Sequence, residues 1–227
     1  MRYKTLQLVK PTEEKHNITT RLSAILTLLA VGVMLYIGIR HFNDVDELGQ
    51  AWGRYAFVHV IFGAVGFLFI QFSAQDSIIP RKYRPMEVNT ILFSGIVLLI
   101  AMGSQFIAQA TYSVSTTEQA LYYVFSAVTE EVFFRGFMCY AVIRTFGNKM
   151  KPKTLILMKM VVIVVSGVIF AVLHTNYQGT AMFWGVLIGG ILFGTAFVFF
   201  LKYDLTAMIL GHFILNLIVT GTWLVNL

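Results

Sequence analysis

The feature that most constrains this chain is a succession of long apolar runs, which a water-soluble domain could not leave uncovered. Each run is long enough to cross about 30 Å of hydrocarbon at about 1.5 Å per residue. Seven runs meet this condition, at about 22–39, 51–72, 88–110, 120–143, 155–173, 181–201 and 205–225. With 57% hydrophobic residues and a mean hydropathy of +0.75, the chain is expected to lie in a bilayer.

A helical fold explains these runs better than a barrel does. Barrel strands would be about ten residues long and would alternate in polarity, whereas these runs are continuously apolar. The sequence therefore predicts an all-α, polytopic integral membrane bundle of about seven transmembrane helices. Residues 1–21 form a polar segment without a signal cleavage site, so the first span is expected to be retained. Residues 22–227 are then expected to form a single helical membrane domain.

The basic residues follow the alternation expected of a multi-pass membrane protein. They gather before the first run and in the connections after the second, fourth and sixth runs. By the positive-inside rule, this pattern predicts a cytoplasmic N-terminus and an external C-terminus. The net charge of +6 is then explained by topology and by contact with the lipid bilayer, so no nucleic-acid partner is expected. The compactness of the chain favours a bacterial cell membrane.

One apolar run contains three formal charges, in the stretch TEEVFFRG at residues 129–136. Ionisable side chains within a span cost roughly 2.5–3.5 kcal/mol on insertion scales, so each is a functional hypothesis by default. Glu131 and Arg135 are four residues apart, in the order that favours an ion pair on one helical face. Glu130 is turned by about 100° from its neighbour, so it can face a cavity and act as a general base.

Two later runs contain polar residues with the same spacing. Phe170 and His174 are four residues apart in the fifth run, and His212 and Asn216 are four apart in the seventh, so each pair shares a helical face. The central parts of the first and third runs contain no ionisable residue. The second run differs from them, since it has an arginine and a histidine, His59, nearer its start.

These side chains suit hydrolysis without a covalent intermediate. A carboxylate and an imidazole can deprotonate a water, while a second imidazole and a carboxamide can donate to the oxyanion. No serine lies in a G-x-S-x-G setting, and the single cysteine, Cys139, is expected to be a buried hydrophobe. The same residues could instead join helices by hydrogen bonds, or a glutamate and two histidines could bind zinc. The H-E-x-x-H helix of zinc proteases is absent from the sequence, and no metal or other cofactor is expected.

In their order and spacing, the polar residues resemble the CAAX-protease and bacteriocin-processing family, the CPBP or Abi group of intramembrane glutamate endopeptidases. The resemblance covers about residues 121–216. Its three motifs are Glu130-Glu131-x-x-x-Arg135, Phe170-x-x-x-His174 and His212-x-x-x-Asn216.

The resemblance implies a metal-independent protease and a role for each motif residue. Glu130 with His174 would activate the water. His212 with Asn216 would stabilise the oxyanion. Glu131 with Arg135 would orient the site.

The resemblance also implies a substrate class, namely a membrane-associated peptide or protein that is cut near its C-terminus or at a leader junction. Some members resemble processors of small peptides such as bacteriocins. A non-catalytic scaffold, or an immunity or regulatory partner of another membrane protein, is the alternative. A transporter is a third possibility, although paired inverted halves with interrupted helices are not evident.

Straight spans would put the candidate residues at different depths in the membrane. Glu130 would lie about 15 Å and His212 about 20 Å from the outer boundary, whereas His174 would lie close to that boundary. A shared water would then require a tilted segment at 117–128, a re-entrant stretch at 177–179 or a break near Gly211.

Overall fold

A computed structural model describes residues 16–45, 51–74, 116–147, 150–178, 180, 183–201 and 203–224. Within these ranges, the regular structure is helical and no strand occurs, which confirms the predicted all-α class. In the described part of the chain, four segments are long and apolar enough to cross a membrane, and a shorter apolar segment is found at Leu205–Leu217. The four are Leu22–Arg40, Trp52–Ile70, Pro152–Thr175 and Phe183–Phe200.

The predicted number of about seven spans is not confirmed. The run at 88–110 lies outside the described residues, and so do residues 1–15 of the predicted polar N-terminal segment. The run at 120–143 is helical but carries the charges of the TEEVFFRG stretch, and it is not among the four long apolar segments. The division of the chain at residue 21, the single domain and the cytoplasmic N-terminus stay predictions.

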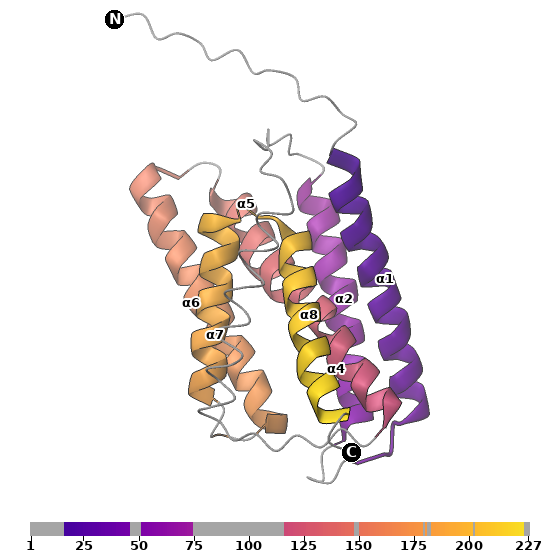
Figure 1. Cartoon of the computed structure of the whole chain (residues 1–227). Helices are drawn as coiled ribbons and strands as arrows, with labels where there is room; N and C mark the ends of the chain where they lie inside the picture. The colour runs from indigo at the N-terminus through magenta and orange to yellow at the C-terminus, as the bar shows by residue number, and fades with distance from the viewer. Residues whose placement is uncertain are drawn as a thin grey trace, which may run out of the picture.

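The bundle has two helix pairs with two further elements between them (Figure 1). One pair is α1 (His16–Arg40) with α2 (Trp52–Ala74), and the other is α6 (Pro152–Gln178) with α7 (Phe183–Thr195), which η4 (Ala196–Phe200) continues. Between the pairs lies α8 (Leu205–Leu224). Beside α8 runs an oblique segment that consists of α4 (Thr117–Glu130), η2 (Glu131–Ala141) and α5 (Val142–Gly147).

Local side-chain interactions define the helix starts. The Thr116 hydroxyl accepts a hydrogen bond from the Gln119 backbone N–H at 3.1 Å and caps α4. Asp204 does the same for α8, where its carboxylate accepts from the Ala207 N–H at 3.1 Å. Proline at the first position of α6 has a fixed φ that suits a helix and removes one N–H that would lack a partner. These caps help fix where the helices that carry the polar residues begin.

Small residues allow close packing where helices cross. Lipid tails are as apolar as leucine, so helices in a bilayer associate through contact rather than through exclusion of water. Gly190 of α7 lies against Gly167 of α6, since a Cβ on Gly190 would be 3.2 Å from the Gly167 Cα. A Cβ on Gly66 of α2 would be 2.8 Å from the backbone oxygen of Val132 in η2. These contacts bring α6 close to α7 and α2 close to the oblique segment.

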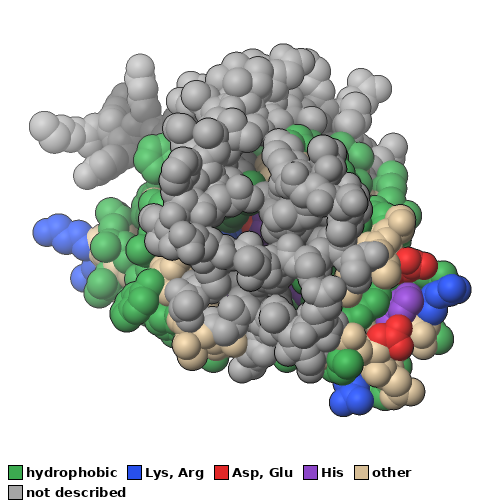
Figure 2. Space-filling model, turned by 60° about the horizontal axis from the view of Figure 1, so that its bottom comes forward, with side chains coloured by type: hydrophobic (Ala, Val, Ile, Leu, Met, Phe, Trp, Pro, Cys, Tyr) green, Lys and Arg blue, Asp and Glu red, His purple; other side chains and the backbone are tan. Residues whose placement is uncertain are grey.

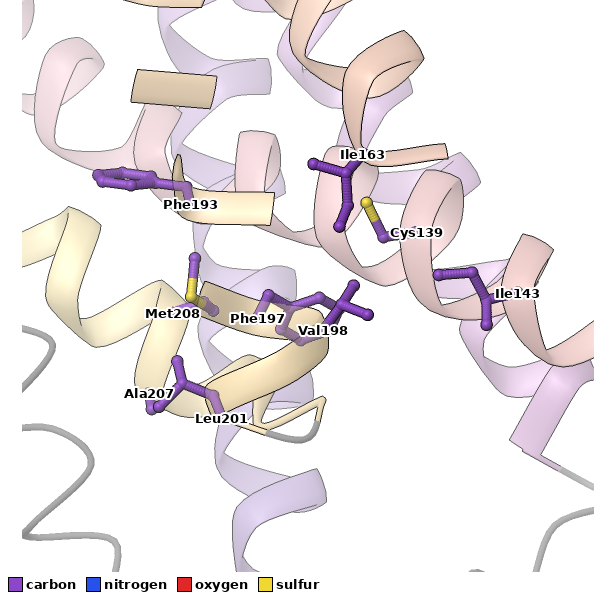
Figure 3. Close-up of a cluster of buried hydrophobic side chains, with 9 residues drawn as sticks. All are labelled: Cys139, Ile143, Ile163, Phe193, Phe197, Val198, Leu201, Ala207 and Met208. Carbon is purple, nitrogen blue, oxygen red and sulfur yellow. The ribbon is translucent and has the colours of Figure 1, made fainter. Parts of the chain in front are cut away.

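A cluster of buried apolar side chains joins the oblique segment to the last three helices (Figure 3). Its members come from η2, α5, α6, α7, η4 and α8, and Leu201 directly follows η4. Cys139 is fully buried among them, as expected of a small hydrophobe. The cluster comprises Cys139, Ile143, Ile163, Phe193, Phe197, Val198, Leu201, Ala207 and Met208.

We predict that Gly66→Ala destabilises the protein whereas Gly32→Ala does not. The new methyl group on α2 would meet the Val132 backbone, which cannot rotate away, and overpacking of this kind typically costs about 1–3 kcal/mol. Gly32 of α1 has nothing within 4 Å of its Cβ position, so there the change only improves helix propensity. Thermal unfolding in detergent measures both variants. Equal melting temperatures would contradict the predicted contact.

Candidate active site

The two adjacent glutamates lie at the junction of two kinds of helix. Glu130 is the last residue of α4, and Glu131 is the first of η2, an eleven-residue π-helix. Most π-helices are single turns, and they occur often at functional sites. Both side chains are buried, with 4% of Glu130 and none of Glu131 exposed. The junction thus places two carboxylates inside the bundle, where each needs partners.

Arg135 provides the charge that balances Glu131. Its Nε lies 3.3 Å from Glu131 Oε2, and the arginine is 1% exposed. The guanidinium carbon is 5.2 Å from the centre of the Phe170 ring and 5.5 Å from that of Phe193, and Nη2 donates to the Gly190 carbonyl at 3.4 Å. Cation–π contacts of this kind gain strength where water is excluded. The contacts of the Arg135 guanidinium with Phe170, Phe193 and Gly190 therefore tie η2 to both α6 and α7.

His212 of α8 lies between the two glutamates. Its Nδ1 is 2.8 Å from Glu131 Oε1, and because a carboxylate only accepts, Nδ1–H is the donor. Its Nε2 is 4.0 Å from Glu130 Oε2. The hydrogen bond to Glu131 thus orients the second ring nitrogen toward Glu130.

His174 of α6 is oriented in a similar way. Its Nδ1 lies 2.8 Å from the Phe170 carbonyl oxygen, which also only accepts. Nε2 then lies 3.8 Å from Glu130 Oε1. The His174 ring packs 4.1 Å from the Phe170 ring, centre to centre, so the predicted Phe-x-x-x-His face is present.

A third histidine, which was noted in the sequence but was not assigned to the site, reaches Glu130 from α2. His59 is 4% exposed, and its Nε2 lies 3.9 Å from Glu130 Oε1. Its Nδ1 is 2.9 Å from the Thr129 hydroxyl. The signal available in the sequence was an ionisable side chain within a span, which is a functional hypothesis by default. No short motif connects it with the later residues.

Asn216 lies one turn after His212 but is not among the groups that surround the Glu130 carboxylate. Its Nδ2 donates to the Tyr123 carbonyl at 2.7 Å, which joins α8 to α4. A carboxamide has two N–H donors, so this bond leaves one for another acceptor. The role of Asn216 at an oxyanion stays a prediction.

The separation in depth that straight spans would impose does not occur, because three helices bring their imidazoles to within 3.8–4.0 Å of one carboxylate. The segment of α4 and η2 runs obliquely across the bundle, as the first of the three alternatives required (Figure 1). α8 continues through Gly211 without a break. α6 continues as far as Gln178, and Gly179 lies outside the described residues.

The geometry around Glu130 suits a small hydrogen-bonding molecule. Distances of 3.8–4.0 Å are too long for direct hydrogen bonds and raise the question of a bridging water. Ligands of one tetrahedral zinc would lie roughly 3.3 Å apart, which is closer than these atoms lie. In the described part of the chain, no group of three or more potential ligands has the geometry of a metal site.

The end of the molecule at which α4 begins and α8 ends faces the viewer in Figure 2. Charged and histidine side chains gather at one edge of this end, and acidic and histidine side chains are also visible near its middle.

The exposed surface of α6 is apolar over much of its length and is suited to lipid. The exposed apolar residues include Ile156, Leu157, Met160, Val161, Val164 and Val165.

The comparison with protein families identifies the class of this site. Residues 112–218 match the family described as type II CAAX prenyl endopeptidase, Rce1-like. No curated protein and no solved structure gives a significant match. The matched region contains α4, η2, the helix pair α6–α7 and most of α8, but it does not include α2.

The match over residues 112–218 is to the Rce1-like family, in agreement with the resemblance that the motifs indicated. The family is one of CAAX-type proteases, and the apolar helices make the chain an integral membrane protein. The matched region includes the motif residues on α4, η2, α6 and α8, whereas His59 lies outside it.

We predict that Glu131→Gln destabilises the protein more than the double change Glu131→Gln with Arg135→Met does. The single change leaves a buried cation without its counter-charge, which typically costs about 3–5 kcal/mol, whereas the double change removes both charges. Thermal unfolding in detergent gives the order of stability. A double variant that loses at least as much stability as the single one would argue against a buried ion pair.

Proposed function

We propose that the protein is an intramembrane endopeptidase that hydrolyses a membrane-associated peptide or protein with a water activated by Glu130. The observation that carries the proposal is the convergence of His174 and His212 on the Glu130 carboxylate from helices far apart in the sequence. Membership of a protease family supplies the reaction class. Buried ionisable groups at one point in a membrane bundle are costly, and they are typically retained for chemistry.

The water is held between Glu130 Oε1 and His174 Nε2, which lie 3.8 Å apart. The Phe170 carbonyl holds the Nδ1–H of His174, so in the neutral ring Nε2 accepts a hydrogen bond from the water. As the water oxygen bonds to the peptide carbon, its proton passes to Glu130. The C–N bond then breaks, and the same proton leaves Glu130 for the departing amine.

The oxyanion that forms on the peptide carbonyl requires hydrogen-bond donors. His212 donates from Nε2 when both of its ring nitrogens carry protons, and in that state Glu131 accepts from Nδ1. The second amide N–H of Asn216 is the other donor, because the first is held by the Tyr123 carbonyl. Arg135 keeps the Glu131 carboxylate in place for His212.

The substrate class follows from the family and from the bilayer. We propose a membrane-associated peptide or protein cut near its C-terminus, as in CAAX processing, or at a leader junction, as in bacteriocin maturation. Among the described residues, Arg144, Lys151 and Lys153 lie where α5 ends and α6 begins, and under the positive-inside rule this end faces the cytoplasm. A bacterial cell membrane is the proposed location.

We predict that Glu130→Gln lowers kcat at least about 100-fold, because the amide cannot take a proton from water. The protein is reconstituted in liposomes with a fluorogenic farnesylated peptide that ends in a CAAX tetrapeptide. Cleavage is compared with that by Glu118→Gln, a change in the first turn of the same helix that should leave kcat unaltered. Comparative peptidomics of cells with the wild-type chain or Glu130→Gln would identify the natural substrate. Full activity of Glu130→Gln in either assay would eliminate the mechanism.

We also predict that the activity resists chelation. Incubation with 1,10-phenanthroline, followed by removal of the chelator and of any extracted metal, should leave the cleavage rate within about twofold, since every step above uses protein groups and water. Loss of activity that zinc then restores would replace this mechanism with the zinc alternative.

A further inference from the structure

We propose that His59 is a positioning residue of this site: it holds the Glu130 carboxyl while that group carries the proton taken from water. The proposal rests on the proposed function and extends it to α2, outside the region that matches the family. It starts from the fact that His59 Nε2 and His174 Nε2 face the same oxygen, Glu130 Oε1, at 3.9 and 3.8 Å.

A short chain of hydrogen bonds determines how His59 is protonated. The Thr129 hydroxyl lies 2.9 Å from the Ser126 carbonyl and donates to it. That hydroxyl has no second proton, so toward His59 Nδ1 at 2.9 Å it can only accept, and Nδ1 must be the donor. In the neutral ring, Nε2 is therefore the acceptor, and it is the nitrogen that faces Glu130.

The local packing holds this arrangement in place. Gly63 lies one turn after His59 on α2, and a Cβ there would be 3.2 Å from the Thr129 Cγ2. The glycine thus lets α2 approach α4 at the level of Thr129. The His59 ring also packs edge-on against Tyr122, with ring centres 5.4 Å apart. The hydrogen bond with Thr129 and the ring contact with Tyr122, both on α4, therefore hold His59 with Nε2 toward the carboxylate.

These contacts give His59 a task at one stage of the reaction. Before hydrolysis, the Glu130 carboxylate and the Nε2 atoms of neutral His59 and His174 are all acceptors. Once Glu130 has taken the proton of the water, its carboxyl is a donor, and His59 Nε2 can accept from Oε1–H when the two atoms approach to about 2.7 Å. His174 remains with the water and the substrate. The proton is then given up to the leaving amine, and His59 ends the cycle unchanged.

The proposal predicts a selective loss of turnover. His59→Ala should lower kcat about 10- to 100-fold with KM within about twofold, because the residue acts on Glu130 rather than on the substrate. Free imidazole should restore part of kcat. In the double variant His59→Ala with Glu130→Gln, imidazole should restore nothing.

Thr129 provides a matched pair of variants that leave the imidazole in place. Thr129→Val removes the acceptor of His59 Nδ1–H and should lower kcat, whereas Thr129→Ser keeps the hydroxyl and should retain kcat. If His59→Ala unfolds, this pair still tests the proposal by the same assay on the farnesylated peptide in liposomes.

The results separate this inference from the proposed function. An inactive Glu130→Gln together with wild-type kcat in His59→Ala and in Thr129→Val would overturn only the role of His59. A purely structural histidine would show in either of two results. In the first, His59→Ala lowers the melting temperature but leaves kcat unchanged. In the second, imidazole does not restore the kcat of His59→Ala, and Thr129→Ser loses as much kcat as Thr129→Val. A fully active Glu130→Gln would instead remove the proposed function itself.

Discussion

The bundle depends on the neutralisation of one buried cation. Arg135 lies within a helical segment surrounded by apolar side chains, and an uncompensated charge there would cost several kcal/mol. Glu131 supplies the opposite charge from the same helix, and α6 and α7 supply two aromatic faces and a carbonyl. His212 of α8 binds the far oxygen of Glu131. Four elements, η2, α6, α7 and α8, thus contribute to the surroundings of this one ion pair, so the packing of the last helices and the geometry of the site depend on the same contacts.

The same arrangement separates the two glutamates in function. Both oxygens of Glu131 face a partner, Arg135 on one side and His212 on the other. Glu130, one residue earlier, faces only imidazole nitrogens at 3.8–4.0 Å among its ion-pair contacts in the described residues. The change from α-helix to π-helix falls between them and alters how successive side chains are directed around the axis. The contacts of Glu131 are therefore those of a structural carboxylate, and Glu130 is the carboxylate to which we assign the proposed chemistry.

Sequence reasoning predicted the side-chain contacts in the site that depend on residue spacing along one helix. Four-residue intervals correctly placed Glu131 beside Arg135 and Phe170 beneath His174. It could not place Glu130 beside His174, because their distance depends on the oblique course of α4 and η2 rather than on any local interval. The place of His59 in the site was harder still to predict from the sequence, since only tertiary packing brings α2 to Glu130. The all-helical class followed from the apolar runs, which need no knowledge of how the helices cross.

The hydrogen bonds of the three histidines explain why this constellation suits water rather than a covalent nucleophile. Each Nδ1–H is held by an acceptor on the protein, namely the Thr129 hydroxyl, the Phe170 carbonyl or the Glu131 carboxylate. In neutral rings, the Nε2 atoms of His59 and His174 then present lone pairs toward Glu130, whereas His212 donates from Nε2 when it is protonated. An acceptor set binds a molecule that brings its own protons, and water brings two. In the proposed mechanism, one proton of that water moves to Glu130, after which the former acceptor becomes a donor that His59 can accept from.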